Sequence, residues 1–192
     1  MKLELAFGNK KLPKSTAIFN LGTAMKCPSA ELGLCQMANT GVRCYALKAE
    51  TQYPAVGPYR QRQLDYWRKS TPILFAMEFL AIVERKRTKV THLRVNESGD
   101  FYHQSDVDNM ELVAFLLKTK GITTYCYTSR SDLDFSGCES LVVNGSAFKP
   151  EGGNEFKAVK ELPKRRKVCI GDCRQCDLCT KKHGKTVFVK FH

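Results

Sequence analysis

The chain has 192 residues, of which 43% are hydrophobic, 26% charged and 10% aromatic. These values are typical of one globular domain, with or without a small appendage, and they exclude a disordered or fibrous chain. No apolar run approaches the roughly 18 residues of a membrane span, since the richest stretch, 73–83, contains Glu78. We therefore expect no membrane association. Because the first residues lack the apolar core of a signal sequence, we expect the protein in the cytoplasm.

The hydrophobic pattern predicts strands and helices in alternation along the chain. The predicted strands cover residues 3–7, 16–21, 91–96, 123–128 and 140–144, and two short pieces of the tail, 167–168 and 187–189. The predicted helices cover residues 58–69, residues 73–87, and a segment that Ser105 caps and Gly121 ends. Residues 73–87 are apolar nearly all round, so we expect that helix to be largely buried.

Strands that alternate with helices favour an α/β fold of parallel βα units, either a partial parallel barrel or an open sheet. A long cysteine-rich loop follows the early strand 16–21, and a second cysteine-rich segment lies in the tail. We expect two parts: an α/β core over residues 1–156, which contains the first cysteines, and a basic tail over residues 157–192 that packs on the core.

The net charge of the chain is +12, and its excess of basic residues is concentrated in the tail. Residues 157–192 contain 11 basic and 3 acidic side chains. A basic patch of this kind is typical of proteins that bind a polyanion, although an ordinary solvated surface is the alternative. We expect nucleic acid or an acidic protein as the partner, with no oligomeric state indicated. The contiguous residues that would bind it are Lys164, Arg165, Arg166 and Lys167.

Nine cysteines in a chain without an export signal favour metal binding or catalysis over disulfides, because cytosolic thiols stay reduced. Cys126 and Cys138 stand apart and are expected to be core or turn thiols. The other seven form two groups: Cys27, Cys35 and Cys44 in the early loop, and Cys169, Cys173, Cys176 and Cys179 in the tail.

The tail group places four thiols within eleven residues, which favours an iron–sulfur cluster. A zinc site usually takes two cysteine pairs separated by a longer span, so zinc is the second alternative and purely structural thiols are the third. The first group has three cysteines, so its cluster would either keep one open iron or take a fourth ligand from the tail. The seven thiols could hold one 4Fe–4S cluster or two.

Polar side chains follow two of the predicted strands, at 97–100 and 129–132. Because the carboxyl ends of parallel strands form the functional edge of such a sheet, we expect these residues to share one face with the first cysteine group. Turn formation alone is the alternative explanation. The residues that would line a cofactor pocket are Ser98, Asp100, Thr128 and Arg130, and the catalytic candidates among them are Asp100, Arg130 and Ser98.

Several segments together resemble the phage gene product 88 family over about residues 15 to 180. The segments are Cys27-Pro28, Cys35, 44–48, 98–102 and 127–130. The resemblance implies a phage-encoded protein and a distant likeness to radical S-adenosylmethionine enzymes, whose cluster loop follows the first strand of a partial barrel. The first group is wider than the usual C-x3-C-x2-C loop of those enzymes, and Ser98-Gly99-Asp100 is the only candidate for their glycine-rich motif.

We therefore expect a phage iron–sulfur protein that binds nucleic acid or a host protein in the host cytoplasm, with a mainly structural cluster. A radical enzyme that binds S-adenosylmethionine and acts on nucleic acid or a phosphate-bearing substrate is the first alternative. A zinc protein that binds nucleic acid is the second. The sequence does not indicate whether the protein is an enzyme.

Overall fold

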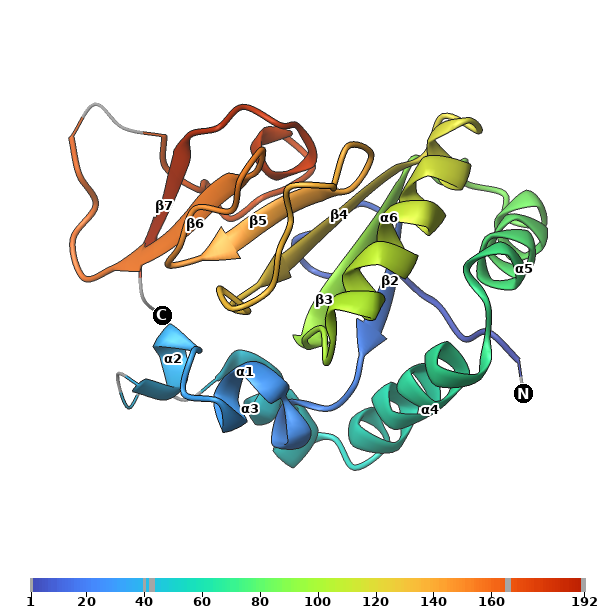
Figure 1. The fold of residues 1–192 in the computed structure, drawn as a ribbon, viewed down its shortest axis with the longest axis horizontal. Helices are drawn as coiled ribbons and strands as arrows, with labels where there is room; N and C mark the ends of the chain where they lie inside the picture. Colours follow the sequence, from blue (N-terminus) through green and yellow to red (C-terminus); the bar gives the residue numbers. More distant parts are fainter. Residues whose placement is uncertain (1, 40, 42–43, 165–166, 191–192) are drawn as a thin grey trace.

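The computed structural model describes residues 2–39, 41, 44–164 and 167–190 (Figure 1). Within these ranges, seven strands form one open sheet in the order β1 to β7. β1 is antiparallel to β2, and every later pair of neighbours is parallel. The strands are β1 (Ala6–Phe7), β2 (Thr16–Leu21), β3 (His92–Gly99), β4 (Thr123–Thr128), β5 (Val142–Ser146), β6 (Asn154–Val159) and β7 (Thr186–Lys190).

The helices connect the early strands and cover one face of the sheet. The α-helices in the described ranges are α1 (Pro28–Glu31), α2 (Gln36–Asn39), α3 (Tyr45–Gln52), α4 (Val56–Lys69), α5 (Pro72–Glu84) and α6 (Gln104–Lys118). Two 3-10 helices are η1 (Ala24–Lys26) and η2 (Leu178–Thr180). Figure 1 shows α6 lying over β3 and β4, with α5 beside it, while α1 to α3 gather beyond the arrowhead of β2. The predicted α/β class is therefore confirmed in the form of an open sheet.

The two faces of the sheet differ in chemistry because side chains alternate along each strand. The face under the helices is apolar, and its fully buried residues include Phe19, Leu93 and Val95, which pack with helix residues such as Phe75 and Val113. The opposite face carries polar and aromatic side chains. On that face Thr16 of β2 pairs in register with His92 of β3, and Arg94 of β3 pairs with Tyr125 of β4. Tyr127 lies on the same face, two residues after Tyr125. This polar face is the one on which the cysteine-rich tail lies.

Some predicted elements are confirmed and others are wrong. β2 and β4 match the predicted ranges residue for residue. The prediction that the helix after Thr71 is largely buried is wrong: it ends at Glu84, and Ile73 and Met77 are exposed while Phe75 and Phe79 are buried. The helix has α6 and the sheet on one side only, so the rest of its apolar surface faces solvent.

Three further differences concern caps and edges. His103, not Ser105, is the N-cap of α6, where it forms a capping box with Asp106. β6 was not predicted, because the glycines before it indicated a turn. It spans the expected boundary at residue 156, and β7 pairs with it in the same sheet. The predicted strand at 167–168 forms only an isolated bridge, between Val168 and Phe188.

Gly99, at the end of β3, holds a conformation that a side chain would not fit. Its φ is +70°, and a Cβ atom there would lie 2.6 Å from the carbonyl oxygen of Leu21 on β2. Gly121 has a similar φ of +72°, with no heavy atom within 4 Å of its Cβ position. The two glycines therefore share the same backbone requirement and differ in the space around them.

Gly99→Ala should lower the free energy of unfolding at least twice as much as Gly121→Ala. The left-handed conformation costs an L-residue about 1–2 kcal/mol at either position, and only Gly99→Ala adds a clash with the backbone of β2. Urea unfolding of the two variants measures the difference. Equal losses of stability would show that the close approach of β2 and β3 at this point is wrong.

Candidate functional site

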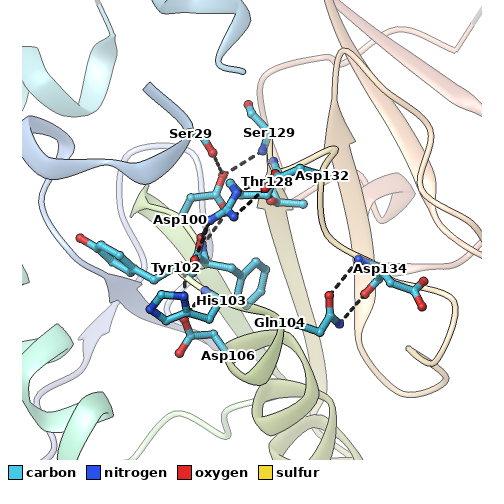
Figure 2. Close-up of polar contacts among 12 residues, drawn as sticks. Ser29, Asp100, Tyr102, His103, Gln104, Asp106, Thr128, Ser129, Asp132 and Asp134 are labelled. Carbon is cyan, nitrogen blue, oxygen red and sulfur yellow. Dashed lines mark hydrogen bonds and ion pairs between the residues drawn. The ribbon is translucent and has the colours of Figure 1, made fainter. Parts of the chain in front are cut away.

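Asp100 is the centre of a buried polar cluster at the carboxyl ends of β3 and β4 (Figure 2). Its carboxylate accepts hydrogen bonds from the Ser29 hydroxyl at 2.5 Å, from the Ser129 backbone N–H at 2.8 Å and from the Phe101 backbone N–H at 2.9 Å. Burial raises the pKa of Asp100, and the hydrogen bonds from Ser29 and Ser129 oppose that shift. Because Ser29 lies in α1, this one carboxylate joins the first cysteine loop to the ends of two strands.

The guanidinium of Arg130 is also engaged by groups of this chain. Nε and Nη2 form a bidentate pair with the carboxylate of Asp132, at 2.8 and 2.7 Å. Nη1 donates to the carbonyl oxygens of Phe101 and Tyr102. The hydroxyl of Thr128 accepts a hydrogen bond from the backbone N–H of Arg130 at 3.1 Å. A ligand carboxylate would therefore have to displace Asp132 to reach this side chain.

Ser98 belongs to a second buried network, whose centre is Glu50 on α3. Glu50 forms an ion pair with Arg60 of α4 at 2.8 Å, and both side chains are almost wholly buried. It also accepts hydrogen bonds from the Ser98 hydroxyl at 3.2 Å and from the backbone N–H of Ala24 at 2.8 Å. Ala24 begins the 3-10 helix that leads into Cys27, so Glu50 positions the start of the first cysteine loop. Sequence patterns did not identify Glu50 as a functional candidate.

The first cysteine group lies in this same region. Cys27, Cys35 and Cys44 are all half-buried, and they stand immediately before α1, α2 and α3. Burial raises the pKa of the Cys27 thiol to about 12, and the nearby charges of Asp100 and Cys35 add to the shift. The sequence-predicted residues Ser98, Asp100, Thr128 and Arg130 are therefore brought together with this group, at the carboxyl ends of the strands.

The tail group lies elsewhere, over the polar face of the sheet. All four tail cysteines line a cavity of about 550 Å³. The sheet residues that line its other side include His92, Arg94, Tyr125 and Tyr127, and Thr16 at the very start of β2. The cavity thus lies toward the amino ends of β2 and β3, whereas Asp100 follows the carboxyl end of β3.

Buried asparagines hold the tail segment onto the sheet. The side-chain amide of Asn144 donates to the carbonyl oxygen of Cys179 at 2.9 Å, and that of Asn154 donates to the carbonyl oxygen of Lys181 at 2.9 Å. The backbone N–H of Cys173 donates to the carbonyl oxygen of Lys11 at 3.0 Å. The tail segment is therefore attached at several points, by backbone groups that do not depend on the cysteine side chains.

The sulfur atoms of the two groups have different neighbours. The pKa of Cys27 is raised by the nearby charge of Cys35. The pKa of Cys179 is raised instead by the charges of the other three tail cysteines. Burial raises the pKa of Cys179 to about 11. In the described part of the chain, no three His, Cys, Asp or Glu side chains are arranged so that they could hold a metal ion.

Of the predicted polyanion-binding residues, Lys164 is exposed and Lys167 is half-buried. Arg165 and Arg166 lie outside the described residues. None of the helices in the described ranges is long and apolar enough to cross a membrane.

The structure defines an α/β protein with an open, mostly parallel sheet, a buried carboxylate cluster at one end of the strands and a cysteine-lined cavity over the polar face. The family model of gene product 88 matches residues 3–148, which is most of the chain. The chain therefore belongs to the phage gene product 88 family. No curated protein and no solved structure matches it.

The family match begins earlier and ends earlier than the sequence motifs indicated. It includes the first cysteine group and both strand-end clusters, and it stops at residue 148, before the tail cysteines. The comparisons give no support to a likeness with radical S-adenosylmethionine enzymes.

Glu50→Gln should lower the free energy of unfolding by about 3 kcal/mol or more, because it leaves the buried charge of Arg60 without its partner. The matched control is Glu4→Gln, which breaks the exposed pair of Glu4 with Arg62, at 2.8 Å, and should cost less than about 1 kcal/mol. Urea unfolding measures both. Similar losses in the two variants would contradict the role of Glu50 as the anchor of the first cysteine loop.

Proposed function

We propose that this protein is a phage iron–sulfur protein with a mainly structural cluster, and that it binds nucleic acid or an acidic host protein in the host cytoplasm. The observation that carries the proposal is the division of its cysteines into two kinds. Cys126 and Cys138 are buried in the core, as expected of apolar thiols. The other seven are free, half-buried or exposed, and lie outside the strands and helices or in the short η2.

A cluster fits the tail segment better than a single zinc ion does. A tetrahedral zinc ion with Zn–S bonds of about 2.3 Å draws its sulfur ligands to within about 3.8 Å of one another. The tail cysteines instead line a cavity of about 550 Å³. A polynuclear cluster has sulfur ligands farther apart, and dense cysteine runs are typical of it. Zinc remains the alternative that the metal analysis below tests.

A structural role fits the place of the tail in the fold. From Val159 to Thr186 the described chain contains only the short helix η2 and one isolated bridge. Few apolar side chains of this segment are buried, so its own packing contributes little to its stability. Metal coordination supplies free energy of folding in such segments. A cluster bound there would fix the tail on the sheet.

A radical enzyme that binds S-adenosylmethionine is the second candidate. The observation in its favour is that a three-cysteine group lies beside the buried Asp100 cluster, at the carboxyl ends of parallel strands. A three-ligand metal site leaves a position open for a small ligand. If S-adenosylmethionine alters the electron-spin resonance spectrum of the reduced cluster, and Asp100→Ala abolishes that change, this candidate replaces the structural one. An unaltered spectrum at saturating cofactor retires it.

Protein purified without oxygen should be brown and should contain iron and acid-labile sulfide. Its absorption should show a broad band at about 400 nm, from charge transfer between thiolate and iron. Metal analysis and the visible spectrum measure both. Colourless protein with one or two zinc ions per chain would contradict the iron–sulfur proposal.

Replacing Lys164, Arg165, Arg166 and Lys167 with serine should weaken binding to nucleic acid and reduce its salt dependence. The slope of log affinity against log salt concentration should fall by up to about 4, close to one for each phosphate that the protein no longer neutralises. Titrations of a labelled oligonucleotide at several salt concentrations measure it.

The matched control removes the same charge from a second basic cluster, at the end of α5, whose exposed members are Arg85, Lys86, Arg87 and Lys89. It should leave the affinity close to that of the unmodified protein. An affinity that changes neither with salt concentration nor with the tail substitutions would contradict the nucleic-acid proposal and leave the acidic protein as the partner.

A further inference from the structure

The cavity over the polar face has two chemically different walls. One wall is the tail segment with its four cysteines. The other is the sheet, and its charged and titratable side chains are His92 and Arg94, beside the tyrosines of β4. Burial lowers the pKa of His92, so this imidazole is neutral near pH 7. The permanent charge of the sheet wall is therefore the guanidinium of Arg94.

The hydrogen-bond donors of Arg94 are not all satisfied within the described part of the chain. Its Nε is buried and has no hydrogen-bond partner among the described residues. Its nearest carboxylate contact, between Nη1 and Glu97, is 3.7 Å long, and the guanidinium lies over the ring of Tyr127 with its Cζ 5.2 Å from the ring centroid. A buried donor without a partner costs free energy. Because Arg94 also lines the cavity, its guanidinium attracts an anionic group bound there.

The other charges along the cavity are already paired. Asp172 forms an ion pair with Arg174 at 2.7 Å, and Asp177 forms one with Lys181. Both residues of each pair belong to the tail segment, so their charges cancel within it. Arg94, whose ion pair with Glu97 is long at 3.7 Å, therefore supplies the positive charge of the sheet wall, and the ligand that fits it is negative.

We infer that the four tail cysteines hold one iron–sulfur cluster in this cavity, and that Arg94 and Tyr127 of the sheet stabilise its negative charge. The inference rests on the proposed function and assigns the cluster to a site. A 4Fe–4S cluster with four thiolate ligands is an anion, so a buried guanidinium beside it is favourable. The hydroxyl of Tyr127 already forms a hydrogen bond with the sulfur of Cys179.

The first cysteine group offers a less favourable environment for the same anion. The charge that acts most strongly on Cys27 is the carboxylate of Asp100. The nearby guanidinium of Arg130 is paired with Asp132, so it offsets that carboxylate only in part. The first group also has three cysteines rather than four. Charge and ligand number both favour the tail as the cluster site.

The assignment is tested by iron and sulfide analysis of the full chain after purification without oxygen. The double variant Cys173→Ser/Cys176→Ser should lose at least half of the iron that the unmodified protein contains. Cys27→Ser/Cys35→Ser is the matched comparison and should retain the tail cluster. If the tail variant keeps its iron while the first-group variant loses it, the assignment is overturned and the proposed function stands. If the unmodified protein contains no iron and sulfide, the proposed function itself fails.

Two variants that keep all cysteines test the role of the sheet. Arg94→Gln and Tyr127→Phe should each shift the midpoint potential of the cluster to a more negative value, because each removes a group that favours the reduced, more negative state. Arg94→Lys keeps the positive charge, so its midpoint potential should lie close to that of the unmodified protein. The matched control is Arg62→Gln, at an exposed pair outside the cavity. Redox titration measures the potentials, and values unchanged from the unmodified protein in both variants would overturn the inference.

Discussion

The alternation of side chains along six parallel strands, β2 to β7, is the constraint on which the rest of the structure depends. It places Phe19 and Val95 under the helices and leaves Arg94 and Tyr127 on the opposite face. No α-helix covers that second face in the described part of the chain, and the tail lies on it instead. A polar sheet face and a cysteine-rich segment are therefore brought together by strand geometry and not by sequence proximity.

The two cysteine groups differ mainly in the charge of their surroundings. Around Cys27 the buried charges are the carboxylate of Asp100 and the Glu50–Arg60 pair, which hold the loop against the strand ends. Around the tail group the buried charge is the guanidinium of Arg94, which has a long ion pair with Glu97 and whose Nε has no hydrogen-bond partner among the described residues. A buried carboxylate that accepts several hydrogen bonds organises a loop, whereas a buried guanidinium with an unused donor favours an anionic ligand. This contrast is the reason we propose that a cluster is bound by the tail group rather than by the first group.

Much of the fold could be predicted from the sequence, because β2 and β4 are short apolar or aromatic runs between clear turn signals. β6 could not, since its sequence, from Asn154 to Val159, becomes a strand only by pairing with β5 and β7. Cysteine spacing located both groups. It could not reveal Arg94 or Glu50, because a charged residue shows its burial only when distant elements pack around it.

The central claim is that the cluster lies between the tail cysteines and the polar face of the sheet. Crystals of the protein purified without oxygen, measured on both sides of the iron absorption edge, would locate the metal directly. The account predicts an anomalous iron peak in the cavity lined by Arg94, Tyr127 and the four tail cysteines. An iron peak beside Cys27, Cys35 and Cys44 alone, or a zinc signal in the tail with no iron, would contradict it.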